Sequence, residues 1–147
     1  MGKWYTMKKD WQGKSFGGIT LEWNYQNERW EELYLPRYIK KCLHRFGHSH
    51  PKRPQDSLHP APIAKFTRTT PSPPSPDDAP KLDDKVIKRI HKIYGSILWY
   101  MRAADVTTFK ALNAIGRKQS KATETTRHWA NWLLDYLATH PNRKTKF

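Results

Sequence analysis

The N-terminal third of the chain contains two stretches in which apolar and polar positions alternate. Residues 16–23 (FGGITLEW) and 29–35 (RWEELYL) are rich in β-branched and aromatic side chains, and the polar run 24–28 between them favours a turn. We therefore predict a β-hairpin, which would be marginally stable in water by itself. In the first stretch every second side chain is apolar, so that one face of the strand is apolar: Ile19, Leu21 and Trp23.

After the hairpin the apolar spacing becomes helical. Pro36 stands where a helix can begin, and Gly47 suits the position after its end. Between them, apolar residues recur at the spacing of one helix face: Tyr38, Ile39, Cys42, Leu43 and Phe46. The opposite side is basic and carries Lys40, Lys41, His44 and Arg45. This pattern predicts a short amphipathic helix.

The composition changes between His48 and Pro80. Ten of the eleven prolines lie between Pro51 and Pro141, and the run 71–76 (PSPPSP) can continue neither a helix nor a central strand. The segment is basic in its first half and acidic at its end. We predict an extended, mobile linker in which Ile63 and Phe66 can dock locally.

Helical spacing dominates the chain after the linker. A first helix is predicted from near Leu82 to near Ala103, because two aspartates at its start suit the positive end of the helix dipole. A second is predicted over 106–119, and a third follows capping residues at 120–124 and stops at 140–141. The expected core positions are Val86, Ile87, Ile90, Ile93, Tyr94, Ile97, Leu98 and Met101 in the first, Phe109, Leu112 and Ile115 in the second, and Trp129, Trp132, Leu133, Tyr136 and Leu137 in the third.

Together these elements predict an α+β fold in four parts. Residues 1–47 hold the hairpin and the short helix, 48–80 form the Pro-rich linker, and 81–141 form a three-helix lobe. The basic segment 142–147 can begin a further strand.

Charge narrows the range of partners. The chain has 27 Lys and Arg against 13 Asp and Glu, which gives a net charge of +14 and favours polyanions, with nucleic acid first and an anionic membrane surface second. The alternative is that the charge only keeps an aromatic-rich chain soluble. A single cysteine, Cys42, fits an intracellular protein of the cytoplasm or nucleus. No apolar run approaches the roughly 18 residues that span a bilayer, and no signal peptide is recognisable, so we expect a soluble protein.

Candidate catalytic and metal-binding groups are few. Four residues within the nine positions 42–50 are of zinc-binding type, but Cys42 belongs to an apolar stripe and no second ligand pair exists, so we predict no metal site. Of the two Asp-Asp doublets, 77–78 stands in the Pro-rich segment and 83–84 starts a helix. A two-metal polymerase needs carboxylates on a strand turn that hold ions about 4 Å apart. We therefore predict no catalytic residues, and no cofactor.

The hairpin region resembles the end of the palm in copia-type LTR retrotransposon reverse transcriptases. The matching runs are 10–13 (DWQG), 16–25 (FGGITLEWNY) and 35–46 (LPRYIKKCLHRF). In that family the strand belongs to the primer grip, which holds the 3′ end of the primer, so the resemblance implies nucleic-acid contacts at Phe16 and Gly18. The sequence departs from the family at Gly17, where a large apolar residue is usual.

The helical region resembles the thumb of the same enzymes. Residues 90–101 (IHKIYGSILWYM) are similar to its first helix, and 128–137 to the element that precedes the RNase H domain, toward which 142–147 would begin a connection. By this resemblance Gly95, one turn from His91 and from Trp99, would face the minor groove of the template–primer duplex, which is wide and shallow in an A-form hybrid. The basic positions expected to contact phosphates are Lys40, Lys41, Arg45, Lys52, Arg53, Lys88 and Lys92.

The resemblance implies a fragment of an RNA-directed DNA polymerase, part of a Pol polyprotein, that lacks the catalytic aspartates. The parent family uses Mg ions, but this fragment would be inactive alone and would at most bind an RNA–DNA hybrid or a DNA duplex. It could instead complete a palm supplied by another chain. A different class of function is a basic helical adaptor that binds RNA or a protein through its Pro-Ser linker. Trp99 has an alternative role as a core residue, and Gly95 as a tolerated helix glycine.

Overall fold

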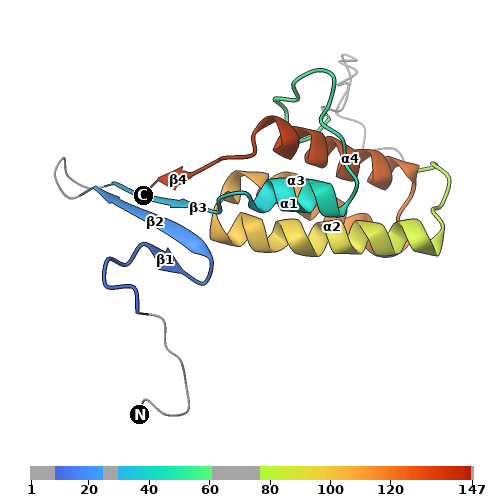
Figure 1. Cartoon of the computed structure of the whole chain (residues 1–147). Helices are drawn as coiled ribbons and strands as arrows, with labels where there is room; N and C mark the ends of the chain where they lie inside the picture. The colour runs from blue at the N-terminus through green and yellow to red at the C-terminus, as the bar shows by residue number, and fades with distance from the viewer. Residues whose placement is uncertain (1–8, 25–29, 61–76, 147) are drawn as a thin grey trace, which may run out of the picture.

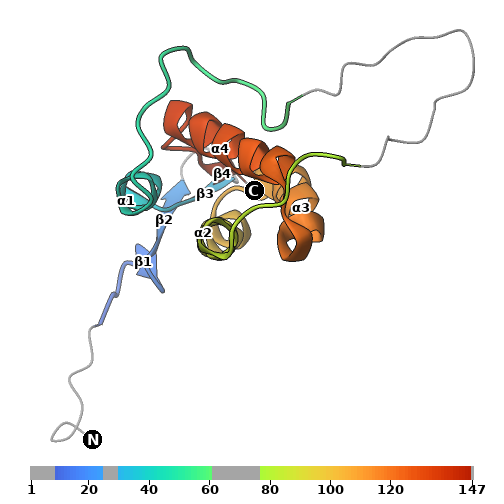
Figure 2. The ribbon, with the colours of Figure 1, turned by 90° about the vertical axis from the view of Figure 1, so that its right-hand side faces the viewer.

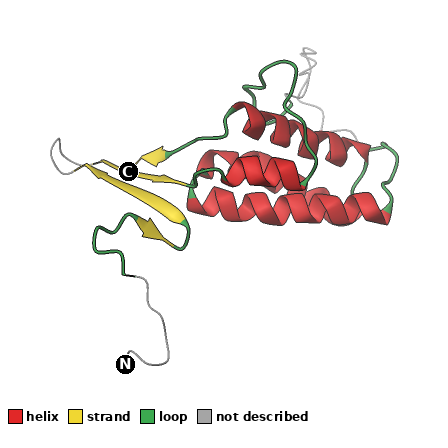
Figure 3. Cartoon of the chain, viewed as in Figure 1, coloured by secondary structure: helices red, strands yellow, loops and turns green. Residues whose placement is uncertain are grey.

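The sheet and the helices occupy opposite ends of the molecule. The computed structural model describes residues 9–24, 30–60 and 77–146. A four-stranded antiparallel sheet, in the order β1-β2-β3-β4, lies at one end, and four α-helices pack together at the other (Figures 1 and 3). The predicted α+β class is therefore confirmed.

The predicted hairpin is formed by β2 (Ile19–Asn24) and β3 (Trp30–Tyr34), with Thr20 opposite Tyr34 and Leu21 opposite Leu33. The predicted first strand was too long, however. Ser15–Phe16 is a separate strand, β1, which pairs with the start of β2 through a two-residue turn. Gly17 and Gly18 occupy this turn with φ of +58° and +85°, the positive values that a type I′ hairpin turn requires and glycine adopts at little cost.

The C-terminal segment completes the sheet. Strand β4 (Thr145–Lys146) pairs with β3, placing Lys146 opposite Glu32 and Thr145 opposite Leu33. Both long strands of the hairpin therefore have a neighbour from the same chain.

A lysine close to β4 neutralises two facing carboxylates on the sheet. Glu22 and Glu32 stand directly opposite each other on β2 and β3, an arrangement that is unfavourable for like charges. Lys144 Nζ lies 2.9 Å from Glu22 Oε2 and 2.6 Å from Glu32 Oε2. The hydrogen bond from Lys144, followed by one from Tyr34, lowers the pKa of Glu22, and the two carboxylates raise the pKa of Lys144.

The predicted helices are present. They are α1 (Tyr38–Arg45), α2 (Asp84–Ala103), α3 (Phe109–Lys118) and α4 (Glu124–Thr139), with 3-10 turns at Val106–Thr108 and Gln119–Lys121. Helix α1 ends as expected at Gly47, whose φ is +59°. The amide of Gly47 donates to His44 O and that of His48 to Leu43 O, which is a Schellman ending. None of the described helices is long and apolar enough to cross a membrane.

The core lies among α2, α3 and α4, and α1 packs against α4 (Figure 2). Side-chain hydrogen bonds join α1 to α2. Leu112, Ile115, Leu133, Tyr136 and Leu137 are buried as predicted. One predicted core residue is not: Phe109 stands at the start of α3 and is 55% exposed. Six others are only partly buried: Val86, Ile87, Tyr94, Leu98, Trp129 and Trp132. The two tryptophans also contact the segment 48–60.

The first part of the predicted linker lies along α4. His48 Nε2 is 2.7 Å from Asp135 Oδ1, the Gln55 amide donates to Thr139 Oγ1 at 3.0 Å, and Trp132 Nε1 donates to Ser57 O at 2.8 Å. The rings of His59 and Trp129 are 4.8 Å apart. Residues 48–60 are thus anchored to the helical lobe. The predicted docking of Ile63 and Phe66 falls outside the described residues.

The end of the same segment is anchored at the other end of α4. Asp77 accepts hydrogen bonds from the hydroxyls of Thr123 and Thr125, at 2.8 and 3.0 Å, and from Lys118 Nζ at 3.1 Å. The bond from Thr123, with those from Lys118 and Thr125, lowers the pKa of Asp77 to about 2. The carboxylate therefore fastens the chain to the start of α4 while it is ionised.

Candidate nucleic-acid interface

Helices α1 and α2 carry many basic and few acidic residues. Residues 33–55 contain no Asp or Glu, and α2 contains only Asp84, at its first position. The two helices carry between them Lys40, Lys41, Arg45, Lys85, Lys88, Arg89, Lys92 and Arg102. Because the two helices hold only one carboxylate, at the first position of α2, these side chains produce a positive field over them. We call this the α1–α2 surface.

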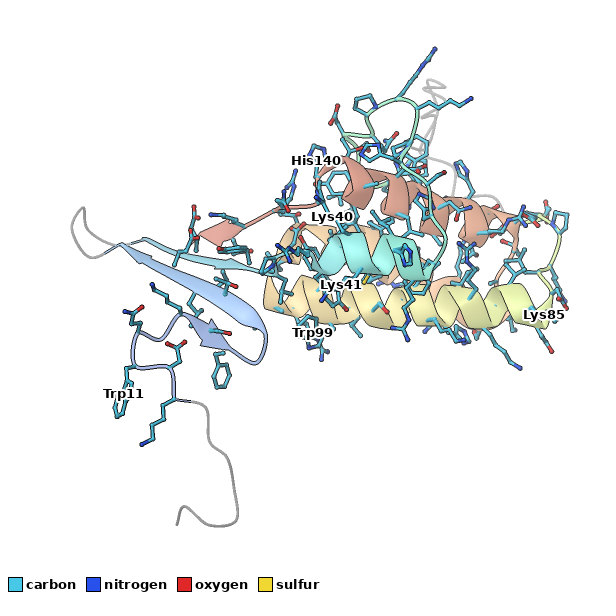
Figure 4. The ribbon with its side chains drawn as sticks, in the orientation of Figure 1. Trp11, Lys40, Lys41, Lys85, Trp99 and His140 are labelled. Atoms are coloured by element: carbon cyan, nitrogen blue, oxygen red, sulfur yellow. The ribbon has the colours of Figure 1, made fainter. Side chains whose placement is uncertain are left out.

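Two hydrogen bonds between the helices fix their relative direction. Tyr38 OH, at the start of α1, donates to Ser96 O in the second half of α2 at 2.9 Å. Arg89, in the first half of α2, donates to Phe46 O at the end of α1 at 2.7 Å. The helices therefore run antiparallel, and α1 lies alongside the part of α2 between Arg89 and Tyr100. Figure 4 labels Lys41 on α1 and Lys85 and Trp99 on α2, spread along this pair.

Trp99 is held in place at one end of the surface. Its side chain is 43% exposed, and its ring centroid lies 5.0 Å from that of Tyr38 at an angle of 40°. Tyr38 itself stacks on Tyr100, with centroids 5.8 Å apart and planes within 3°. Burial raises the pKa of Tyr38 to about 12, so its hydroxyl remains protonated and keeps its bond to Ser96. The indole is thus ordered on one side and open to solvent on the other.

The predicted row on α2 faces solvent. His91, Gly95 and Trp99 are all exposed, as are Lys88 and Lys92. A Cβ placed on Gly95 would meet nothing within 4 Å, so the helix backbone is accessible there. A His91 ring nitrogen lies 3.2 Å from Gln119 O, which ties the start of the row to the turn after α3.

The other predicted site residues are distributed over the molecule. Lys40, Lys41 and Arg45 are exposed on α1 and belong to the α1–α2 surface. Phe16 and Gly18 lie at the β1–β2 turn of the sheet, where Phe16 is 77% exposed. The pair Lys52 and Arg53, expected to join the lysines of α1, lies in the segment anchored to α4. Sequence reasoning missed Tyr38, because it fits the apolar stripe of α1 and nothing in the sequence reveals its contact with Trp99.

The described residues contain no group of three or more His, Cys, Asp or Glu arranged to hold a metal ion. Cys42 is buried, and burial raises the pKa of its thiol. What the α1–α2 surface can do chemically is attract an anion, contact it with ammonium and guanidinium groups, and offer one flat aromatic face.

Comparison with known proteins found no matching family model, no matching curated protein and no matching solved structure.

Proposed function

We propose that this chain binds a nucleic-acid duplex through the α1–α2 surface, as a fragment of a copia-type RNA-directed DNA polymerase. The observation that carries the proposal is the pairing of two helices with eight basic residues and one acidic residue beside an ordered, exposed tryptophan. Lysine and arginine side chains at such a surface neutralise phosphates and release counterions. The choice of family is supported by the sequence resemblance to copia-type reverse transcriptases described above.

The preferred ligand is an RNA–DNA hybrid. Its A-form minor groove is wide and shallow and exposes sugars, which a helix can approach where its backbone is bare. Gly95 supplies such a position on α2, and Trp99 stands one turn further along the same exposed row. Contacts of this kind read shape rather than sequence, so we expect little base preference.

The chain alone is proposed to be inactive as a polymerase. Of its two Asp-Asp doublets, the first contains Asp77, whose carboxylate is engaged with Thr123, Thr125 and Lys118. The second stands at the start of α2 rather than on a strand turn. Two metal ions in line with a primer end need a different arrangement of carboxylates.

Fluorescence anisotropy of the full chain with a labelled hybrid, a DNA duplex and a single strand, over a salt series, tests the proposal. Lys88→Glu/Lys92→Glu is expected to weaken hybrid binding roughly tenfold or more and to reduce the salt slope by about two. Lys110→Glu/Arg117→Glu, on exposed positions of α3, changes the net charge equally and serves as the matched control. Trp99→Ala should weaken hybrid binding without changing the salt slope.

Equal losses from both double reversals would mean that only the net charge matters, and would reject a specific surface. The adaptor alternative is tested by deleting residues 62–75, which leaves the anchored stretches 48–60 and 77–82 in place. The proposal expects unchanged hybrid binding after this deletion, whereas an adaptor that uses its Pro-Ser segment would lose its ligand.

A further inference from the structure

The loop before β1 has a conformation fixed by one aspartate. Asp10 Oδ1 accepts from the Gln12 amide at 3.2 Å, Oδ2 accepts from the Ser15 amide at 2.8 Å, and Asp10 O accepts from the Gly13 amide at 3.3 Å. Gly13 has a φ of +61°, which glycine adopts without strain. The amide of Leu21, in β2, donates to Lys14 O at 2.9 Å and so ties the loop to the sheet.

This loop holds a tryptophan in the solvent. Trp11 is one of the two central residues of the turn and is 88% exposed. Phe16, at the end of the loop, is 77% exposed. Leaving an indole in water forgoes the burial that normally stabilises it. Because the backbone is already ordered by Asp10, a ligand that covers Trp11 would pay little for ordering the loop.

The charges around Trp11 favour a polyanionic ligand. Lys9 and Lys14 flank the turn, and Lys9 Nζ lies 5.7 Å from the centre of the Trp11 ring. The one acidic residue of the loop has both carboxylate oxygens occupied by backbone amides. Aromatic faces interleaved with lysines suit a single strand, whose bases stack while its phosphates contact the cations. A duplex keeps its bases stacked inside and offers an indole no base face.

We propose that the 9–16 loop is a second nucleic-acid contact, at which Trp11 stacks on a base of a single-stranded segment that continues from the bound duplex. This inference rests on the proposed function for the location of the duplex, but it concerns a different element and a different form of nucleic acid. In Figure 4, Trp11 lies beyond the sheet and Trp99 beside α2, so the two labelled tryptophans mark separate contacts.

The test compares one hybrid with blunt ends and the same hybrid with a single-stranded extension of ten nucleotides, together with the free single strand, all by anisotropy with the full chain. The extension is expected to tighten binding by the wild-type chain roughly tenfold, the value of one stacked base. Trp11→Ala and Trp11→Leu should abolish this gain, and Trp11→Phe should keep most of it. Phe109→Ala, which removes an exposed aromatic residue from α3, is the matched control and should change nothing.

The possible results separate the loop inference from the proposed function. A gain that persists in Trp11→Ala overturns the proposal, and a gain that persists in Trp11→Leu shows apolar contact rather than stacking, which also overturns it. If the chain binds the free strand through Trp11 but no duplex, the loop inference stands and the proposed function fails. If the blunt hybrid binds normally and the extension adds nothing, the proposed function stands and the loop inference fails. Absence of binding to every nucleic acid rejects both.

Discussion

At the scale of the residue, two helix glycines have different reasons to be glycine. A Cβ on Gly95 in α2 would meet only open space. A Cβ on Gly116 in α3 would lie 2.7 Å from Tyr94 Cε2, so the side chain is excluded by the packing of α2 against α3. Both glycines lower helix propensity equally. Gly116 is thus required by packing, whereas stability gives no reason for Gly95.

Alanine at the two positions should therefore have opposite effects. We expect Gly95→Ala to raise the free energy of unfolding by about 0.5–1 kcal/mol, the gain in helix propensity. We expect Gly116→Ala to lower it by about 1 kcal/mol, because displacing the Tyr94 ring outweighs that gain. Urea unfolding followed by circular dichroism measures both. A stabilised Gly116→Ala would show that Tyr94 moves aside at no cost.

The residues that were wrongly predicted share one cause. Trp129 and Trp132 fit the apolar stripe of α4, yet they are only partly buried, and both contact a segment that looks like a free linker in the sequence. Phe109 begins α3 at a position where the helical spacing points inward, but the 3-10 turn before it changes the phase, and the side chain reaches solvent. The spacing of apolar residues predicts which side of a helix is apolar. Which segment covers that side depends on the whole fold.

At the scale of the element, local signals located the helices and misjudged the first strand. Apolar stripes with recognisable ends placed all four α-helices within a few residues, because a helix forms from contacts near in sequence. The alternation from Phe16 to Trp23 concealed a turn, since Gly17 and Gly18 interrupt it by only two positions. A Gly-Gly pair between apolar residues is itself a hairpin signal, and it should outweigh the continuous pattern.

Asp77 makes the attachment at the start of α4 sensitive to acid. Its pKa is lowered from 3.8 to about 2 in the folded chain, so the ionised carboxylate stabilises the fold above pH 4, and this contribution is lost as the pH falls from 4 toward 2. The side chain is one-fifth exposed, so we expect Asp77→Asn to cost about 1–2 kcal/mol at pH 6.

Urea unfolding of the wild type and of Asp77→Asn at pH 6 and pH 2.5 measures the difference, which should be much smaller at the lower pH. Asp78→Asn removes the same charge from the exposed neighbour and is the control. A difference between wild type and Asp77→Asn that is the same at both pH values would mean that the carboxylate charge contributes nothing.

At the scale of the whole molecule, Lys144 joins the C-terminal segment to the sheet. It lies between Glu22 and Glu32, whose like charges face each other across β2 and β3. Thr145 makes the complementary contact, donating its hydroxyl to Ala104 O just after α2. The segment after α4 therefore contacts both the sheet and the helical lobe. The sequence indicates a strand in this segment but not its ion pairs, because Lys144 stands more than a hundred residues from Glu22 and Glu32.

Lys144→Met should consequently lower the melting temperature and speed amide hydrogen exchange in β2 and β3, because the facing carboxylates lose their shared cation. Adding Glu32→Gln should restore part of the loss by removing one of the two charges. Lys110→Met on α3 is the control for the change in net charge. Unchanged exchange in the hairpin after Lys144→Met would show that β4 pairing alone holds the sheet.

The attachment of both flanks of the Pro-rich segment to α4 makes the intervening stretch a natural insertion point. Ser57 and His59 are held by Trp132 and Trp129, and Asp77 is held at the start of the same helix. The positions of these two attachment points are therefore set by α4, and they do not depend on the length of the segment that connects them. Doubling that length costs only about 0.6 kcal/mol of closure entropy. A fluorophore, an affinity tag or a small domain can be introduced there while the folded parts on either side keep their places.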